Sequence, residues 1–219
     1  MNVVITGANR GIGLALTHAY IKRGDTVYAL CRQASEDLKQ SGANIVENVD
    51  MLNTDALPQC LVSLQKVSID ILINNAGVLE RESLSDWNPA TIEKQFKVNA
   101  LAPLLVTQCL LPSMAANSKV VMITSRMGSM ADNGSGGYYG YRMSKAALNA
   151  AGVSMAKDLA SQGIAVALLH PGFVQTEMVN YGGDIDATTS ALRLQQLIDD
   201  LNLANSGQFW HSNGESLPW

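Results

Sequence analysis

Two side chains that could move a proton together lie four residues apart in this sequence, Tyr141 and Lys145. Residues 146–151 are rich in alanine and leucine, which predicts a helix carrying both side chains on one face. A phenol has a pKa near ~10, and a neighbouring ammonium lowers it by stabilising the phenolate. Such a tyrosine can give or take a proton at a carbonyl oxygen. The spacing also fits a plain surface pair, so the interpretation depends on what the chain places beside it.

A glycine-rich turn near the start of the chain is the first such element. Residues 3–6 form a short apolar stretch that predicts a strand, and Gly7, Gly11 and Gly13 follow it before a predicted helix over residues 14–23. Bare N–H groups at a helix N-terminus favour a phosphate, and glycines let the backbone approach it. A strand, glycine turn and helix in this order predict a nucleotide site, although glycine turns also occur without one.

The residue expected to contact the adenosine ribose is Arg32, at the end of a predicted strand over residues 26–31. An arginine there favours a 2′-phosphate, and Arg10 in the glycine turn is a second candidate contact. The nearest acids considered, Glu36 and Asp37, lie beyond this position. We therefore predict NADP(H) rather than NAD(H), against the alternative of two solvated surface arginines.

Two further predicted strands end in polar residues. Residues 44–49 end in Asp50, which fits either beside an adenine ring or as the cap of a following helix over residues 55–64. Residues 69–73 are almost continuously apolar, as in a strand buried on both faces, and end in an Asn-Asn-Ala-Gly turn at 74–77. The two asparagines need hydrogen-bond partners, so they either brace neighbouring strands beside a dinucleotide or form an ordinary turn.

The second half of the chain adds candidates for chemistry. Asn99 lies inside a mostly apolar segment, residues 90–115, that predicts a helix, and is either catalytic or a buried residue bonded to a strand. Ser125 follows a predicted strand over residues 120–124, at the edge where open α/β sheets bind ligands. A glycine- and serine-rich loop separates Ser125 from Tyr141, long enough to bring the hydroxyl beside the phenol.

Residues 164–169 predict a sixth strand, residues 187–201 a last helix, and residues 207–210 a short final strand. The alternation of strands and helices predicts an α/β fold: a single-domain doubly wound parallel sheet of about seven strands with helices on both faces, covering residues 1–219. Hydrophobic residues make up 47% of the 219, enough for one well-buried core.

Composition limits the partners. A net charge of -4 without blocks of like charge argues against nucleic acid or an anionic membrane as the partner. Cys31, Cys60 and Cys109 are widely spaced and predict neither a disulfide framework nor a metal site. The first predicted strand begins at the second residue, so we expect no signal peptide. No apolar run reaches the ~18 residues of a membrane span. We expect a cytoplasmic protein with a small-molecule substrate.

Taken together, these segments strongly resemble the short-chain dehydrogenase/reductase family over nearly the whole chain. The matching motifs are TGANRGIG at 6–13, NNAG at 74–77, the Asn99 helix, ITS at 123–125, YRMSK at 141–145 and HPGFVQTE at 170–177. Six motifs in order are highly specific. The closing SGQF and LPW look like the subgroup that contains C-factor signalling proteins and sniffer-type carbonyl reductases.

The resemblance implies a Rossmann fold and hydride transfer from NADPH to a carbonyl carbon. Tyr141 would be the acid/base, Lys145 would lower its pKa and bind the nicotinamide ribose, Ser125 would hold the substrate oxygen, and Asn99 would support a proton-relay water. The residues implied at the cofactor are Gly7, Asn9, Arg10, Gly11, Ile12, Gly13, Arg32, Asp50, Met51, Asn75, Ala76, Gly77, Tyr141, Lys145, Pro171, Gly172, Val174 and Thr176.

The chain departs from the family pattern in two places. The interval from Ser125 to Tyr141 is a few residues longer than usual, which leaves Ser129 as an alternative to Ser125. Only about ten residues, 178–187, stand where the family inserts a long substrate lid, so we expect a shallow, open pocket. Candidate wall residues are Met127, Met130, Tyr138, Phe173, Met178 and Tyr181.

The resemblance also implies a homo-oligomer, a dimer or else a tetramer, paired through the Asn99 and Tyr141 helices. The rival to an NADP-dependent carbonyl reductase is a C-factor-like signalling or regulatory nucleotide-binding protein with little turnover. The complete set of serine, tyrosine, lysine and asparagine favours the enzyme.

Overall fold

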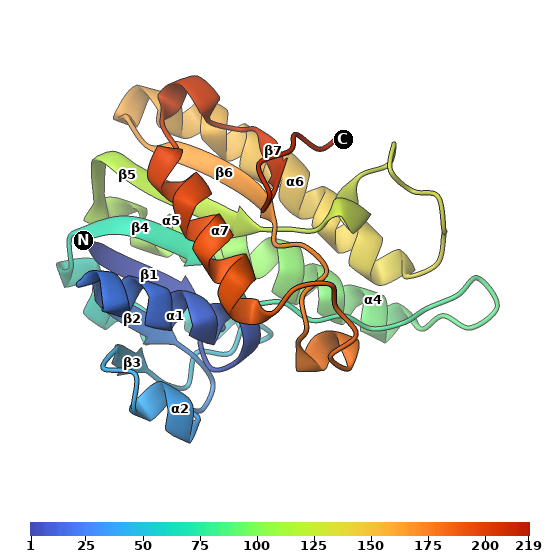
Figure 1. Ribbon diagram of the computed structural model, residues 1–219, viewed down its shortest axis with the longest axis horizontal. Helices are drawn as coiled ribbons and strands as arrows, with labels where there is room; N and C mark the ends of the chain where they lie inside the picture. Colours follow the sequence, from blue (N-terminus) through green and yellow to red (C-terminus); the bar gives the residue numbers. More distant parts are fainter.

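A single parallel sheet of seven strands, in the order β3-β2-β1-β4-β5-β6-β7, forms the centre of the computed structural model, which describes residues 1–219 (Figure 1). The strands are β1 (Asn2–Thr6), β2 (Thr26–Leu30), β3 (Asn44–Val46), β4 (Ile69–Asn74), β5 (Met114–Ile123), β6 (Ala165–His170) and β7 (Phe209–His211). The predicted doubly wound α/β fold is confirmed. The strand order reverses between β1 and β4, and such a point is where open parallel sheets bind ligands.

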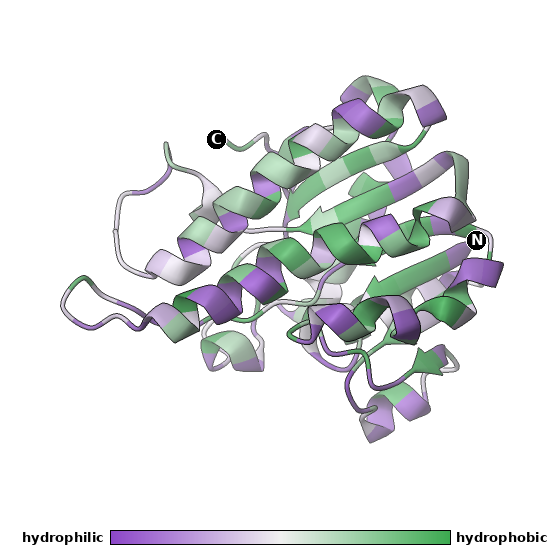
Figure 2. Cartoon of the chain, turned by 180° about the vertical axis from the view of Figure 1, so that it is seen from behind, coloured by the Kyte–Doolittle hydropathy of each residue, from purple (hydrophilic) through white to green (hydrophobic).

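Helices cover both faces of the sheet. On one face α1 (Gly11–Arg23) packs against α7 (Ala187–Asp200). On the other face lie α4 (Pro89–Phe96), α5 (Ala102–Leu110) and α6 (Tyr139–Leu159), which Figure 2 shows from behind. Two short helices lie before and after β3 in the chain, α2 (Glu36–Lys39) and α3 (Leu57–Cys60). None of the helices has both the length and the apolar character that a membrane crossing requires.

Successive side chains of a strand point to opposite faces, and β1 shows how this divides the core. Val3 and Ile5 belong to the apolar cluster beneath α1 and α7, whereas Val4 belongs to the cluster that includes Val98 and Val106 on the opposite face. A strand that is buried on both faces needs a continuous apolar run, which is why the strand sequences are mostly apolar.

The predicted helix over residues 90–115 is wrong in two respects. It is interrupted by a π-helical turn, Lys97–Leu101, where the Ala102 N–H donates to the Lys97 carbonyl five residues before it. Pro103 contributes to this break, because it has no N–H to give the Asn99 carbonyl. The helical segment then closes in a 3₁₀ turn, Leu111–Ser113, so β5 begins six residues earlier than predicted.

The bounds around β3 also differ from those predicted. The strand ends at Val46 rather than at residue 49, because Asn48 has a left-handed backbone (φ 64°) that interrupts an extended strand. The predicted helix over residues 55–64 consists instead of α3 between 3₁₀ turns at Thr54–Ala56 and Val62–Lys66. A proline suits only the first turn of an α-helix, so Pro58 restricts where α3 can begin.

Candidate active site

The glycine turn between β1 and α1 is built so closely that side chains would not fit. A Cβ at Gly13 would lie 2.2 Å from the Gly7 carbonyl oxygen and 2.6 Å from Asn75 Nδ2. A Cβ at Gly7, which has a positive φ of 65°, would lie 2.8 Å from Ala76 Cα. The glycines therefore serve to bring the start of α1 against the ends of β1 and β4.

Asn75 and Thr6 hold this turn in place. Asn75 Nδ2 donates to the Thr6 carbonyl at 3.0 Å and to the Gly7 carbonyl at 3.2 Å. Thr6 Oγ1 in turn accepts the N–H groups of Asn75 and Ala76, both at 3.0 Å. The bracing role considered for the asparagines is thus what the structure shows for Asn75, whose amide is committed to protein contacts.

The N-terminus of α1 has the features of a phosphate site. Its N-cap, Arg10, makes no side-chain cap hydrogen bond, and no acidic residue stands in the first turn, Gly11 and Ile12 included. The N–H groups of a helix N-terminus then lack side-chain acceptors and attract an anion. Together with the close glycine packing, this fits the pyrophosphate of a dinucleotide.

Beyond β2 the structure places Arg32 on the surface, exposed and outside all of the chain's ion pairs. Glu36 and Asp37 are not the only acids to consider, because one from another segment comes close to this position. The Glu47 carboxylate accepts the Ala34 N–H at 2.7 Å, only two residues along the chain from Arg32. A loop after β3 reaches this position, which the linear distance of 15 residues conceals.

Arg10, the second predicted phosphate contact, has a partner of its own. Its guanidinium is hydrogen-bonded to the Glu177 carboxylate, and both side chains are more than half exposed. Asn9, beside it, accepts the Ser35 N–H through its side chain and the Ser35 hydroxyl, at 3.0 Å, through its carbonyl. The glycine turn is thereby linked to the loop after β6 and to the N-cap of α2.

Two predicted adenine-side residues have structural partners. Asp50 Oδ1 accepts the Leu52 N–H at 3.0 Å within a turn, whereas Asn53 stands at the N-cap of the next helical turn, so Asp50 is not the helix cap considered for it. Met51 is buried in the core with Val49 and Leu57.

The turn after β6 faces the glycine turn. Thr176 Cγ2 would lie 3.2 Å from a Cβ at Gly11, so the two loops approach closely. The Pro171 carbonyl accepts the hydroxyls of Ser190 at 2.7 Å and Ser212 at 3.0 Å. Gly172 has a φ of 96°, and Val174 is buried.

Tyr141 and Lys145 lie on the buried side of α6. Lys145 Nζ is 5.8 Å from the centroid of the Tyr141 ring and donates to the Ile123 carbonyl, the end of β5, at 2.9 Å. Burial raises the pKa of Tyr141 to about 12, an effect that the Ser125 side chain partly offsets. Burial lowers the pKa of Lys145 to about 8. Burial is therefore the largest influence on the pKa of Tyr141, and the lowering by Lys145 stays a prediction.

The structure distinguishes Ser125 from Ser129. Ser125 Oγ accepts the Met127 N–H at 3.1 Å, and its hydroxyl acts to lower the pKa of Tyr141. Ser129 Oγ accepts the Asp132 N–H at 3.0 Å within its own turn. Gly128 packs between them against α6, where a Cβ would lie 2.8 Å from the Lys145 carbonyl carbon. This geometry favours Ser125 as the partner of Tyr141.

Asn99 lies in the π turn and is fully buried. Its side chain accepts the Val78 N–H at 2.8 Å and donates to the Val78 carbonyl at 2.8 Å and to Ser144 Oγ at 3.0 Å. A Cβ at Gly77 would lie 3.3 Å from Asn99 Oδ1 and 3.7 Å from Lys145 Nζ. Isolated π turns occur often at functional sites, and this one places Asn99 beside Lys145.

The region expected to take the substrate is open. Met130, Phe173, Met178 and Tyr181 are 76%, 50%, 45% and 68% exposed. The short segment after Glu177 folds into a 3₁₀ turn, Glu177–Val179, followed by two residues with positive φ, and is held to the β6 turn by a bridge between Val174 and Ile185.

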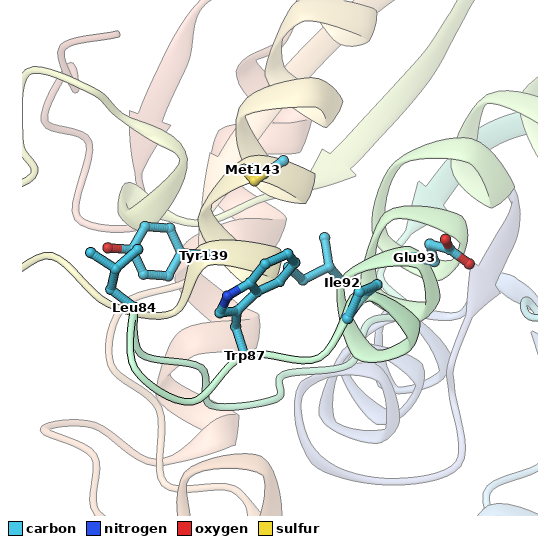
Figure 3. A pocket seen from close by; sticks show the side chains of 7 residues that line it. Leu84, Trp87, Ile92, Glu93, Tyr139 and Met143 are labelled. Atoms are coloured by element: carbon cyan, nitrogen blue, oxygen red, sulfur yellow. The ribbon is translucent and has the colours of Figure 1, made fainter.

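A separate apolar cavity of about 420 Å³ lies between the loop at residues 83–87, α4 and α6 (Figure 3). Its lining residues are Leu84, Trp87, Pro89, Ile92, Glu93, Tyr139 and Met143. Tyr139 and Met143 are two residues out of phase with Tyr141 and Lys145, so they occupy the opposite side of α6. This cavity is distinct from the candidate active site.

Comparison with known proteins agrees with this arrangement. The family profile described as short chain dehydrogenase matches residues 1–184. The chain belongs to this family. A 1-hydroxy-2-glutathionyl-2-methyl-3-butene dehydrogenase of Rhodococcus sp. (strain AD45) is 34% identical over 99% of both chains. The C-signal protein of Myxococcus xanthus is 46% identical over 69% of this chain and 93% of its own.

Two carbonyl reductase structures resemble this short-chain dehydrogenase along its full length. An NADPH-bound carbonyl reductase from chicken fatty liver has a TM-score of 0.90 at 26% identity, covering 100% of this chain and 98% of that one. The carbonyl reductase Sniffer of D. melanogaster has a TM-score of 0.91 at 28% identity, covering 100% and 99%. The protein is therefore an oxidoreductase of the short-chain dehydrogenase family, with C-factor-like and sniffer-like relatives.

Several residues that organise the site were not found from the sequence. Ser144, three residues after Tyr141, could have been recognised from helical spacing, since it shares the buried face of α6. Thr6 ends a predicted strand beside the glycine turn, and a hydroxyl at such a place can hydrogen-bond to nearby backbone groups. The sequence around Glu82 and Gln95 does not indicate their roles, because their hydrogen-bond partners lie on other segments.

Proposed function

We propose that the protein is an NADPH-dependent carbonyl reductase in which Tyr141 gives a proton to the substrate oxygen. The observation that carries this proposal is the convergence of Ser125, Tyr141, Lys145 and Asn99 at the carboxyl edge of the sheet, beside the glycine turn. The NADPH-bound structure of a similar carbonyl reductase supports the cofactor.

When bound, the nicotinamide cofactor supplies hydride chemistry, and the protein binds, orients and handles the proton. Ser125 holds the carbonyl oxygen and Tyr141 donates its proton to it. Lys145, buried next to the phenol, favours the negative charge that develops on Tyr141. The Asn99 amide is engaged by Val78 and Ser144, so its backbone carbonyl is the group we assign to a proton-relay water.

The residues at the glycine turn fit the cofactor's pyrophosphate. The turn is closely packed, and the N–H groups at the N-terminus of α1 have no side-chain acceptors. For the adenosine end we propose a preference for NADPH over NADH, carried mainly by Arg32, because Arg10 is already paired with Glu177. An exposed guanidinium binds a phosphate with two parallel N–H bonds, whereas the Glu47 carboxylate weakens the local positive potential.

Turnover should be measured with NADPH and a panel of ketones, aldehydes and quinones. Oxidation of NADPH that depends on one of these carbonyls, with stoichiometric alcohol or hydroquinone formation, is the expected result. The exposed apolar residues near the turn after β6 favour bulky apolar carbonyl compounds over small polar ones. Absence of turnover across the panel, with NADPH binding intact, would count against the enzyme.

The 46% identity to a C-signal protein supports a second candidate, a signalling or regulatory protein that binds the nucleotide but turns over little. The two candidate functions assign different roles to Tyr141. A signalling role that survives Tyr141→Phe would favour the second, whereas loss of both activity and biological effect would favour the first.

We also propose that the chain forms a homo-oligomer, a dimer, through α4, α5 and α6. Phe96, Leu104 and Met143 on these helices are 46%, 41% and 55% exposed, so apolar surface is available there. Sedimentation at micromolar concentration should show a species of twice the 23.4 kDa chain mass. A monomer under these conditions would contradict the proposal.

A further inference from the structure

A carboxylate far from Tyr141 in the sequence holds the first turn of its helix. Tyr138, which precedes α6, has a left-handed backbone (φ 52°) and makes no side-chain cap. The first N–H groups of a helix need acceptors from elsewhere. The Glu82 carbonyl accepts the Tyr138 N–H at 2.8 Å, and Glu82 Oε2 accepts the Gly140 N–H at 3.2 Å. One residue thus binds the backbone on both sides of the helix start.

Glu82 is itself held firmly. Its side chain is buried, with Oε1 accepting the Thr91 hydroxyl at 3.1 Å and the Gln95 amide at 2.5 Å. Gln95 is fully buried, and its oxygen accepts the Glu80 N–H at 2.9 Å, which sets the orientation of the amide. Thr91 and Gln95 both belong to α4, so this helix holds Oε1 while Oε2 accepts from α6.

The helix start lies directly against this network. A Cβ at Gly140 would be 2.4 Å from Gln95 Nε2, 3.0 Å from Glu82 Oε1 and 3.0 Å from Ile92 Cα. Only a glycine allows such an approach of α6 to α4. Tyr141 is the next residue, so the place of its phenol follows from where this turn is held.

We propose that Glu82 is a positioning residue for Tyr141: its carboxylate, seated on Gln95 and Thr91, holds the first turn of α6 so that the phenol meets the substrate oxygen. This inference rests on the proposed function. A negative group at a helix N-terminus is also stabilising through the helix dipole. Glu82 touches neither substrate nor cofactor and acts through α6.

The test uses Glu82→Gln and Glu82→Ala, with Glu80→Ala as the matched control. Glu80 lies two residues away and forms a partly exposed ion pair with Lys94. Because small misplacements of reacting groups can cost about 10²-fold in rate, we expect kcat to fall by up to about 10²-fold in Glu82→Ala and by less in Glu82→Gln. KM and the NADPH dissociation constant should stay nearly unchanged, and Glu80→Ala should retain wild-type kcat. Exchange of the Gly140 amide with solvent should accelerate in both Glu82 variants.

A double variant separates positioning from a general loss of structure. Added to Tyr141→Phe, either Glu82 substitution should lower kcat no further, because the group being positioned is gone. Wild-type kcat in both Glu82 variants, a fall that persists in the Tyr141→Phe background, or an equal loss of NADPH binding would overturn the positioning role. Glutamine keeps the size of the side chain, so Glu82→Gln tests the inference if the alanine variant does not fold. A fully active Tyr141→Phe would overturn the proposed function itself.

Discussion

The side chain of Asn99 is tied to the helix of Tyr141 through Ser144, whose Oγ accepts from Asn99 Nδ2 at 3.0 Å and donates to the Tyr141 carbonyl at 2.8 Å. The π turn and α6 are therefore linked by side-chain hydrogen bonds. Since all three side chains are buried, and an unpaired buried polar group costs about 1–3 kcal/mol, these contacts keep the two helices in register at the candidate site.

Replacing Tyr141 by phenylalanine should remove carbonyl reduction and leave NADPH affinity almost unchanged, because only the hydroxyl is lost. General acid catalysis contributes about 10²- to 10⁴-fold, so the fall in kcat should reach that range. Steady-state kinetics and fluorescence titration with NADPH measure the two quantities. Tyr139→Phe, on the exposed face of the same helix, is the control. Activity within a few-fold of wild type would exclude Tyr141 as the acid.

Lys145→Met should impair NADPH binding and turnover together, since we assign the ammonium to both ribose and phenol. Burial already lowers the pKa of Lys145 to about 8, so the charge that assists Tyr141 is lost as pH rises above that value. The pH profile of alcohol oxidation should therefore change in the variant. An identical apparent pKa in variant and wild type would contradict the electrostatic role.

Arg32→Asp should reverse or erase the preference for NADPH. A charge-assisted hydrogen bond contributes about 1.5–3 kcal/mol, and exposure reduces this, so the ratio of kcat/KM for NADPH to that for NADH should change by roughly tenfold or more. Glu47→Gln should raise the ratio slightly, and high salt should lower it. A wild type that prefers NADH, or an Arg32→Asp variant with the same ratio, would show that the phosphate is bound elsewhere.

Gly13→Ala should destabilise the protein and weaken NADPH binding, because the new methyl would lie 2.2 Å from the Gly7 carbonyl oxygen. Overpacking of this kind costs about 1–3 kcal/mol. Gly134→Ala is the control, since a Cβ there meets nothing within 4 Å and the backbone is unstrained. Urea unfolding and NADPH titration should separate the two variants, and equal stability would mean that the turn relaxes freely.

Stability should fall as the pH is lowered from 6.5, because burial, with smaller contributions from His211 and Arg126, lowers the pKa of His170 to about 3. Between these values the unfolded chain binds a proton at His170 that the folded chain does not, so the free energy of unfolding rises with pH. His170→Asn should flatten this dependence in urea unfolding at pH 7, 5 and 4. Equal slopes in wild type and His170→Asn would contradict the assignment.

The fold class could be predicted from the residues alone, and so could the sheet edge at which the candidate site lies. Strands, glycine turn and helices follow from local periodicity and composition, and parallel strands bring every strand end to one edge. Ser125, Asn75 and the glycines could therefore be expected at one edge of the sheet, and their roles stay predictions. Tyr141 and Lys145 share a helix face, which depends only on their spacing of four.

Contacts between distant segments depend on how the whole chain packs. Glu82 meets Gly140 across 58 positions and Arg10 meets Glu177 across 167, and no local pattern encodes either pair. Burial likewise raises the pKa of Tyr141, because desolvation depends on everything packed around the phenol. Side-chain partners and dielectric environment are properties of the packed chain, whereas periodicity is a property of the sequence.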